Sequence, residues 1–243
     1  MAVGPLRVPV SPLASGRREL PASAARYVLR VHRLGIGDAF VAFDPEARIE
    51  AEARIIACSR DSATVELDSP RAASLLPNRS VTVVQGLAKG DKLDDIVRDA
   101  TELGATRISP AVVLRSVAAH KSDAAVARWR RIAVEAARQC GRGDVPEVDA
   151  PRPLVDIIGA LEAELRLVLV PGASTRLGGI LARASATSSV ALVIGPEGGL
   201  DPSEISEAVT RGFVAVSLGR FVLRTETACA AALGAALAFS ETV

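Results

Sequence analysis

The sequence predicts an α/β fold in two domains, because two different patterns of hydrophobic residues follow one another along the chain. Residues 1–74 contain short strand-like runs separated by turn residues, which favours a small β-rich domain. From Val81 onward, short β-branched runs alternate with helical segments, which is typical of a mostly parallel sheet. Hydrophobic residues make up 49% of the chain but aromatic residues only 3%, so Ala, Val and Leu must build most of the core.

The first domain is expected to contain one helix and three strands. The helix covers about Ala22–Arg30, and the strands are Asp38–Phe43, Arg48–Cys58 and Thr64–Leu67. A proline-containing stretch, Ser69–Arg79, is the expected linker. The two domains are therefore expected to cover residues 1–74 and 75–243.

The second domain is expected to alternate strands and helices. Its first strand is Val81–Leu87, and Asp91 is expected to cap the helix that follows and ends at Gly104. A strand at Ile108–Leu114 precedes a helix over Asp123–Cys140. The remaining expected strands are Leu167–Val170, Val190–Ile194 and Val214–Leu218, with helices near Ile180, after Asp201 and after Thr225.

Charge is distributed unevenly although the net charge is only +1. Residues 1–35 carry six Arg against Glu19, and residues 107–142 carry eight Lys or Arg against two acids. Such basic islands suit nucleic-acid phosphates, and solvated arginine-rich faces are the alternative. If the islands bind RNA, the arginines expected to contact it are Arg30, Arg33, Arg115, Arg128, Arg131 and Arg142.

Several other classes of protein do not fit the sequence. The three cysteines are far apart and no His, Asp or Glu cluster has ligand spacing, so neither a metal site nor a disulfide framework is expected. No apolar run is long enough to span a bilayer, so no membrane association is expected. Free thiols in a chain without a signal peptide favour a cytoplasmic protein.

The strongest local motif is Ile194-Gly195-Pro196-Glu197-Gly198-Gly199, which directly follows a strand. Its glycines allow the backbone to approach a ligand closely, although a tight turn alone would also explain them. Asp201, Pro202 and Glu204 then form the start of a helix as N-cap, first helical residue and capping-box residue.

A second motif runs from Leu218 to Ala228 into an alanine-rich helix that is apolar nearly all round and so is expected to be buried. Arg224 and Glu226 beside such a helix are unusual, because buried charges are rare unless they are paired or used. One interpretation is a structural ion pair between them, with Thr225 as the helix cap. The other is a catalytic pair.

Four motifs, in one order and spacing, give the chain a family resemblance. They are Thr101–Ala105, Trp129–Pro146, Ile194–Leu200 and Leu218–Ala228. Over most of residues 81–243 the sequence resembles the bacterial 16S rRNA uracil-N3-methyltransferases of the SPOUT superfamily. The amino-terminal part resembles that family's PUA-like β-barrel, chiefly through Val28–Arg33 and the following Gly37-Asp38. The chain departs from the family pattern near Arg26, at His32 and at Asp99.

The resemblance implies a SPOUT-type α/β domain with a deep trefoil knot, preceded by the PUA-like barrel. It also implies a homodimer with its active site at the subunit interface, S-adenosylmethionine as cofactor, no metal, and 16S rRNA or the small ribosomal subunit as partner. The residues that it assigns to the cofactor are Val170, Pro171, Ile194, Gly195, Glu197, Gly198, Gly199, Leu218, Gly219, Leu223 and Thr225.

Methyl transfer to uridine N3 requires alignment of donor and acceptor and removal of the N3 proton. Arg224 is expected to orient the uracil or stabilise its anion, and Glu226 to accept the proton. Two alternatives stay open at this point. One is a SPOUT methyltransferase with another target, such as a ribose 2′-hydroxyl of transfer or ribosomal RNA. The other is a non-catalytic RNA-binding dimer.

Overall fold

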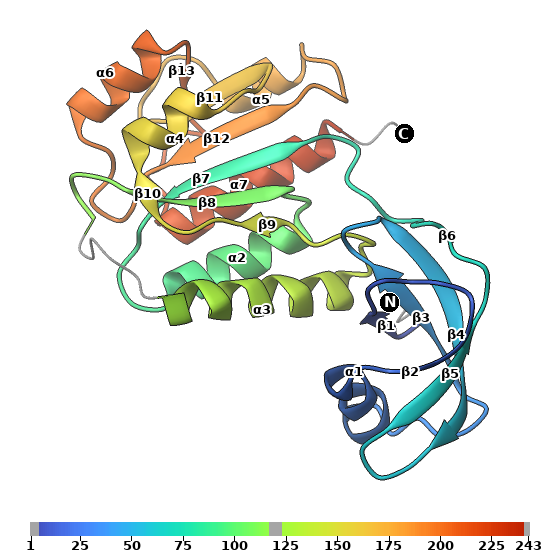
Figure 1. Ribbon diagram of the computed structural model, residues 1–243. Coiled ribbons are helices and arrows are strands. Elements are labelled where there is room, and N and C mark those ends of the chain that lie inside the picture. Colours follow the sequence, from blue (N-terminus) through green and yellow to red (C-terminus); the bar gives the residue numbers. More distant parts are fainter. Residues whose placement is uncertain (1–4, 117–122, 241–243) are drawn as a thin grey trace. The chain divides into compact units, whose positions relative to one another are not determined.

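The structure is a computed structural model that describes residues 5–116 and 123–240 (Figure 1). The chain divides into two compact units, Met1–Leu76 with Ala137–Val145, and Pro77–Ala136 with Pro146–Val243. The expected boundary at residues 74/75 lies close to the division after Leu76. The segment Ala137–Val145 was expected in the second domain but belongs to the first unit. The reason is a close backbone contact, in which the Gly143 N–H donates to the Leu75 carbonyl at 2.7 Å.

The first unit is a six-stranded sheet with a short helical segment. Its strand order is β1-β3-β4-β5-β2, with β6 paired to β4. All neighbours pair antiparallel except β1 and β3, which are parallel. The elements are β1 (Arg7–Pro9), β2 (Gly16–Glu19), α1 (Ala22–Arg26), a π-helix (Tyr27–Val31), β3 (Ala39–Asp44), β4 (Ile49–Cys58), β5 (Ala63–Leu67) and β6 (Arg71–Ala72).

The three strands expected in this unit are confirmed within one residue at each end. The expected single helix is instead a short α-helix that passes into a π-helical turn at Tyr27. The alternating pattern of β4 and β5 places one face in a core with Val28, Phe40 and Ile55, each at most 1% exposed. Three strands were not expected: Arg7–Pro9 (β1) and Gly16–Glu19 (β2) carry weak strand patterns, and Arg71–Ala72 (β6) lies in the expected linker.

The second unit is a seven-stranded sheet in which every pair is parallel. Its strand order is β10-β8-β7-β12-β11-β13, with β9 paired to β8. The strands are β7 (Val81–Gly86), β8 (Arg107–Val112), β9 (Glu147–Val148), β10 (Arg152–Pro153), β11 (Leu165–Leu169), β12 (Val190–Ile194) and β13 (Val214–Val216). The predicted α/β class with a mostly parallel sheet is confirmed.

Helices cover both faces of this sheet (Figure 1). On one face α4 packs against α6 and β8, and on the other α7 packs against α2, α5 and β12. All-round burial explains why strand β12 is apolar at every position. The helices are α2 (Lys92–Glu102), α3 (Asp123–Cys140, which ends in the first unit), α4 (Leu154–Ala160), α5 (Leu177–Leu181), α6 (Pro202–Thr210) and α7 (Thr225–Ala238).

Helix α7 was expected to be buried because it is apolar nearly all round, and the single chain buries only one side of it. Cys229, Ala232 and Leu233 are at most 1% exposed, whereas Thr227 and Ala231 are exposed. A helix of small apolar residues thus leaves an open face in the chain alone.

The predicted helix ends are largely confirmed. Gly104 and Gly141 both adopt the left-handed backbone that ends a helix, with φ of 85° and 86°. Asp91 does occupy the N-cap position of α2 but makes no side-chain capping bond, because its carboxylate accepts a hydrogen bond from Arg128 at 2.8 Å instead.

Candidate active site

Three loops at the carboxyl ends of neighbouring strands enclose the principal cavity. They follow β12, β11 and β13, which lie side by side in the sheet. The carboxyl edge of a parallel α/β sheet is where ligands usually bind. The cavity has a volume of about 660 Å³, which is sufficient for a nucleoside-sized ligand.

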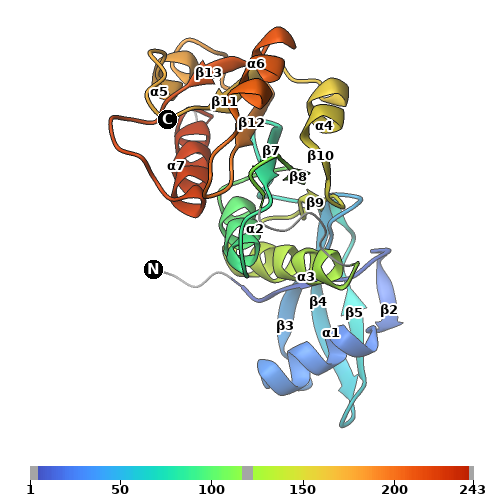
Figure 2. The ribbon, with the colours of Figure 1, turned by 90° about the vertical axis from the view of Figure 1, so that its left-hand side faces the viewer.

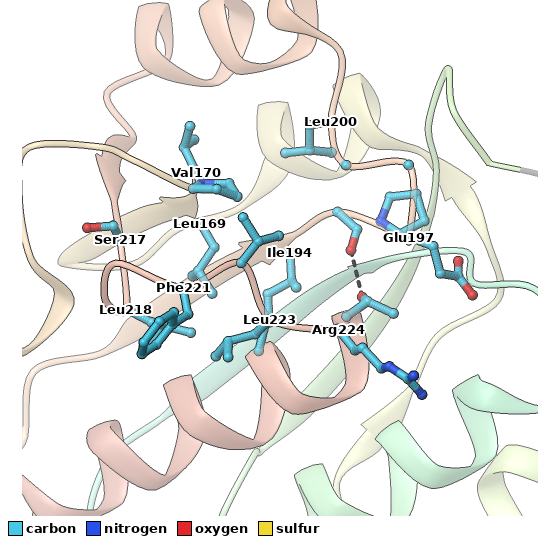
Figure 3. Close-up of a pocket in the computed structure, with 18 of the residues that line it drawn as sticks. Leu169, Val170, Ile194, Glu197, Leu200, Ser217, Leu218, Phe221, Leu223 and Arg224 are labelled. Carbon is cyan, nitrogen blue, oxygen red and sulfur yellow. Dashed lines mark hydrogen bonds between the residues drawn. The ribbon is translucent and has the colours of Figure 1, made fainter.

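Apolar side chains form much of the wall of this cavity (Figure 3). Leu169, Ile194, Leu218 and Leu223 surround its interior, and Phe221 lies at its edge. Apolar walls suit the flat face of an aromatic base, and the backbone groups of the loops can hold its polar edges.

All eleven residues predicted to bind the cofactor line this one cavity. Their gathering from three distant segments is a result of the strand order, since β12 lies between β7 and β11, and β11 between β12 and β13. The prediction omitted several further lining residues, which come from strand ends and from the helices beside the loops: Lys92, Leu169, Leu200, Ile205, Val216, Ser217, Phe221, Val222 and Ala228.

The loop after β12 is tight because its glycines meet neighbouring backbone. A Cβ atom on Gly195 would lie 2.8 Å from the Leu200 nitrogen and 2.9 Å from the Gly199 carbonyl carbon, closer than real Cβ contacts. Gly199 has a φ of 68°, which favours glycine. An added Cβ at Gly198 would meet the Arg115 side chain at 3.2 Å. Gly195 is therefore the most constrained of the three.

Helix α6 fixes the far end of the same loop. The Asp201 carboxylate accepts from the Ser203 N–H at 3.0 Å, and Glu204 accepts from the Asp201 N–H at 2.8 Å. The predicted capping box is therefore confirmed, with Pro202 at the first helical position. The second Glu204 oxygen accepts from the Leu114 N–H at 2.8 Å, which ties the loop to the end of β8.

Thr225 ties the start of α7 to the cavity floor and does not cap the helix as one interpretation expected. The N-cap position belongs to Arg224. The Thr225 hydroxyl donates to the Gly195 carbonyl at 2.6 Å and accepts from Gln85 Nε2 at 2.9 Å (the bond to Gly195 is dashed in Figure 3). Gln85 is fully buried at the end of β7. This chain of hydrogen bonds joins three of the elements around the cavity.

Arg224 lies at the rim of the cavity with its side chain exposed (Figure 3). The expected burial of this charge is therefore wrong for the single chain. Within residues 5–116 and 123–240, no ion pair joins Arg224 to Glu226. The interpretation of the two residues as a mutual structural pair is also wrong, because Glu226 faces a different cation.

That cation is Lys92, in the first turn of α2. Its Nζ lies 2.9 Å from Glu197 Oε1 and 3.6 Å from Glu226 Oε2. The hydrogen bond to Glu197 raises the pKa of Lys92 and keeps it charged. Burial raises the pKa of Glu197, but hydrogen bonds from backbone N–H groups and from Lys92 lower it by more. Lys92 was not predicted from the sequence; its position just after β7, at the same sheet edge as the other loops, was the available signal.

The arginines predicted to bind RNA fall into different environments. Arg33 and Arg131 are exposed. Arg30 pairs with Asp61 and is 46% exposed. Arg115 lines the cavity, where it donates to the Gly198 carbonyl and to Asp201, both at 3.2 Å. All four of these side chains are exposed to solvent, so a phosphate can contact them.

Arg128 and Arg142 are already engaged with carboxylates. Arg128 pairs with Asp91 and with Asp94, which also accepts from the Trp129 indole at 3.1 Å. Arg142 is only 6% exposed and donates to both oxygens of Asp144, at 2.7 and 3.1 Å. Arg142 is therefore not available to an RNA phosphate in this chain, because its buried guanidinium pairs with Asp144 within the first unit.

Metal-binding clusters and membrane-spanning helices are absent from the part of the chain that the structure describes. No group of three or more His, Cys, Asp or Glu side chains there could hold a metal ion, and no helix there has the length and apolarity to cross a membrane. Of the cysteines, Cys229 is buried in α7, and burial raises the pKa of its thiol to about 12. Such a thiol stays protonated and is a poor nucleophile.

Comparisons with known proteins show which family the chain is similar to. An RNA methyltransferase domain family matches residues 75–237. The chain is 33% identical to the ribosomal RNA small subunit methyltransferase E of Synechocystis sp., over 88% of this chain and 70% of the relative. It is 31% identical to the protein of the same name from Bacillus subtilis, over 86% of this chain and 85% of the relative.

Solved structures share the architecture of the whole chain. A ribosomal RNA small subunit methyltransferase E from Neisseria gonorrhoeae, bound to S-adenosyl methionine, has a TM-score of 0.87 and 28% identity, with 96% of each chain covered. A methyltransferase structure from Legionella pneumophila, in complex with the cofactor SAM, has a TM-score of 0.86 and 28% identity. It covers 97% of this chain, and 98% of its own length is matched.

Proposed function

The chain belongs to the ribosomal RNA small subunit methyltransferase E family of RNA methyltransferases, and on that premise we propose that it methylates N3 of a uridine in 16S rRNA. Its methyl donor is S-adenosylmethionine, which is bound in two similar solved structures. The observation that supports this activity most directly is the convergence of three loops on one cavity, with Arg224 at its rim and Glu226 close by.

The cavity fits the cofactor. Its apolar walls suit the adenine ring, and the close approach of Gly195 to Gly199 and Leu200 makes a backbone cradle that a Cβ atom would fill. The residues that would hold the cofactor are the eleven assigned from the sequence. When bound, the cofactor supplies an activated methyl group on a sulfonium, so the protein has to align the acceptor and manage its charge.

Arg224 and Glu226 have different tasks in this proposal. N3 of uridine carries a proton at neutral pH, and its loss leaves negative charge on O2 and O4. The exposed Arg224 guanidinium is free of any described carboxylate and can donate to one of these oxygens. Glu226, held beside Lys92, can accept the proton.

We also propose that the second unit contains a deep trefoil knot. Strand β13 lies at the sheet edge beyond β11, but α7, the next element, packs on α2, α5 and β12. The segment between them swings out before α7 begins (Figure 2), and it lines the cavity together with the loop after β12. This path supports the knot that the resemblance implies.

A homodimer is the proposed active form. The exposed face of α7 and the neighbouring Phe221 and Val222, which are 70% and 79% exposed, make an apolar surface beside the cavity. Exposed apolar surfaces of this kind mark sites of association. A second copy covering it would place a subunit interface next to the active site.

The first unit is proposed to be the PUA-like RNA-binding domain. Its exposed Arg33 and half-exposed Arg30 support this role. We propose that the enzyme binds 16S rRNA or the small ribosomal subunit in the cytoplasm.

Nucleoside mass spectrometry tests the activity. Purified protein, S-adenosylmethionine and either naked 16S rRNA or small subunits from a strain lacking the gene should yield N3-methyluridine. A ribose-methylated product would instead support the alternative target. RNA binding without any methylated product would support a non-catalytic dimer.

A further inference from the structure

Glu226 has an unsatisfied carboxylate oxygen. Its Oε2 atom is buried and accepts no hydrogen bond from any residue that the structure describes, although the whole side chain is 25% exposed. The Lys92 Nζ atom at 3.6 Å is within ion-pair range but too far for a hydrogen bond. Such a buried oxygen is costly to a fold, and a catalytic role is one of the explanations for keeping it.

Lys92 is held more firmly on its other side. Its Nζ donates to Glu197 Oε1 at 2.9 Å, and the Glu197 carboxylate also accepts from the Lys89 N–H at 3.3 Å. Both Lys92 and Glu197 line the cavity, as Arg224 does. The ammonium group therefore has one fixed partner in the loop after β12 and a second, looser partner at the start of α7.

We infer that Lys92 is a positioning residue for methyl transfer: anchored on Glu197, its ammonium group, which lines the cavity, holds the Glu226 carboxylate beside the cavity. The inference rests on the proposed function, in which Glu226 accepts the N3 proton. Two carboxylates lie within 4 Å of the same nitrogen. Without the ammonium they repel each other, and Glu226 turns away from the substrate.

A purely structural role for Lys92 predicts something different. Its side chain is 35% exposed, and ion pairs at that exposure contribute little to stability. A structural role would change the melting temperature, and the methylation rate would fall only as folded protein is lost. A positioning role changes the rate of the folded, cofactor-bound enzyme.

The test is a double-mutant cycle on the full chain with 16S rRNA or small subunits as substrate. Lys92→Met, Glu226→Gln and the double variant are measured by single-turnover methylation at saturating cofactor and RNA, beside cofactor affinity and thermal melts. Lys92→Met should slow methylation roughly 10- to 100-fold, because a misplacement of about 1 Å can cost about 100-fold. Cofactor affinity should change little. Lys89→Met, which removes the same charge three residues earlier, is the matched control.

The double variant distinguishes a role of Lys92 through Glu226 from an independent one. If Lys92 acts through Glu226, the double variant is no slower than Glu226→Gln alone, and Lys92→Arg restores most of the rate. Multiplying effects, or a Lys92→Met enzyme with the wild-type rate, overturn the inference. If Lys92→Met does not fold, Lys92→Gln takes its place in the cycle. Failure of the proposed function looks different, since the wild-type protein then makes no N3-methyluridine at all.

Discussion

The cavity loops could be predicted from the sequence much more fully than the arginine-rich segments. Every residue assigned to the cofactor lines one cavity. Of the six arginines assigned to RNA, Arg142 is buried against Asp144, and Arg128 faces two carboxylates. A sequence motif thus predicts the place of a residue in the structure better than a count of charges does.

The difference has a physical cause. The motif after β12 depends on contacts within a few residues, such as the approach of Gly195 to Leu200. The state of an arginine depends on acids that lie far along the chain, as Asp91 and Asp94 do from Arg128. Local backbone chemistry can therefore be predicted from sequence, and free charge cannot.

The largest effect is expected at Gly195. Gly195→Ala places a Cβ atom 2.8 Å from the Leu200 nitrogen, so the loop that forms the cofactor cradle must move. Overpacking of this kind costs about 1–3 kcal/mol, and we expect the upper end because the contacts are with backbone. Calorimetry should show no measurable cofactor binding, and thermal melts should show a lower melting temperature.

Gly178→Ala is the matched control for this change. Gly178 lies in helix α5, and an added Cβ there meets nothing within 4 Å. Alanine also has the higher helix propensity. Stability and cofactor affinity should be kept or improved. Wild-type cofactor binding by Gly195→Ala would show that the close backbone approach does not shape the cavity.

Arg224 tests whether the rim of the cavity acts on the RNA base and not on the cofactor. Arg224→Lys keeps the charge but loses the planar fork of donors, so the methylation rate should fall about 100-fold or more, roughly 3 kcal/mol. The cofactor affinity and the melting temperature should stay near wild type, since Arg224 is exposed. Single-turnover methylation, calorimetry and melts measure the three quantities.

A fully active Arg224→Lys enzyme would remove Arg224 from the reaction. A slow enzyme with a lower melting temperature would point to a structural role instead. The ion pair with Glu226 no longer offers such a role, because Glu226 faces Lys92.

The elements of the fold show the same difference between local sequence patterns, which can be predicted, and long-range contacts, which cannot. Strands β3, β4, β5, β7 and β12 and helices α3 and α6 were predicted well, because each has a clear period or cap in its own sequence. The weakly patterned β1 and β2 could not be predicted, nor could the transfer of Ala137–Val145 to the first unit. That transfer depends on the long-range hydrogen bond from Gly143 to Leu75.

The candidate site shows most clearly that contacts between distant residues could not be predicted from the sequence. Thr225 was interpreted as a cap from its neighbours, but its hydroxyl serves Gly195 and Gln85, which are 30 and 140 residues away. Lys92 was missed for the same reason, because its partner Glu197 lies in the loop after β12 and its partner Glu226 at the start of α7. The residue types were visible in the sequence, and the pairings were not.

Thr225 gives a prediction of intermediate size. Thr225→Val keeps the shape but removes the hydroxyl, which leaves the buried Gln85 amide and the Gly195 carbonyl without this partner. The Gln85 amide still donates to the Gly86 and Gly195 carbonyls at 3.1 and 3.4 Å, so we expect a loss of about 1 kcal/mol, the lower end for a buried polar group that loses a partner. Urea unfolding should show that loss, and cofactor affinity should fall because Gly195 belongs to the cradle. Thr225→Ser, which keeps the hydroxyl, is the control and should stay close to wild type. Equal stability of the Val and Ser variants would contradict the proposed bridge.

The smallest expected effect separates Arg131 from Arg128, which lie three residues apart on α3. Arg131 is exposed and pairs with no carboxylate among the described residues, whereas Arg128 pairs with Asp91 and Asp94. If Arg131 contacts a phosphate, Arg131→Gln should reduce the slope of log affinity against log salt by about 0.7 to 0.9 and weaken RNA binding across sequences. Arg128→Gln should leave the slope nearly unchanged, because its charge is already neutralised within the protein. Cofactor affinity should be unaffected in both variants. RNA binding measured at four or more salt concentrations distinguishes the two variants. Equal slopes for Arg131→Gln and wild type would show that Arg131 is a solvated arginine that contacts no phosphate.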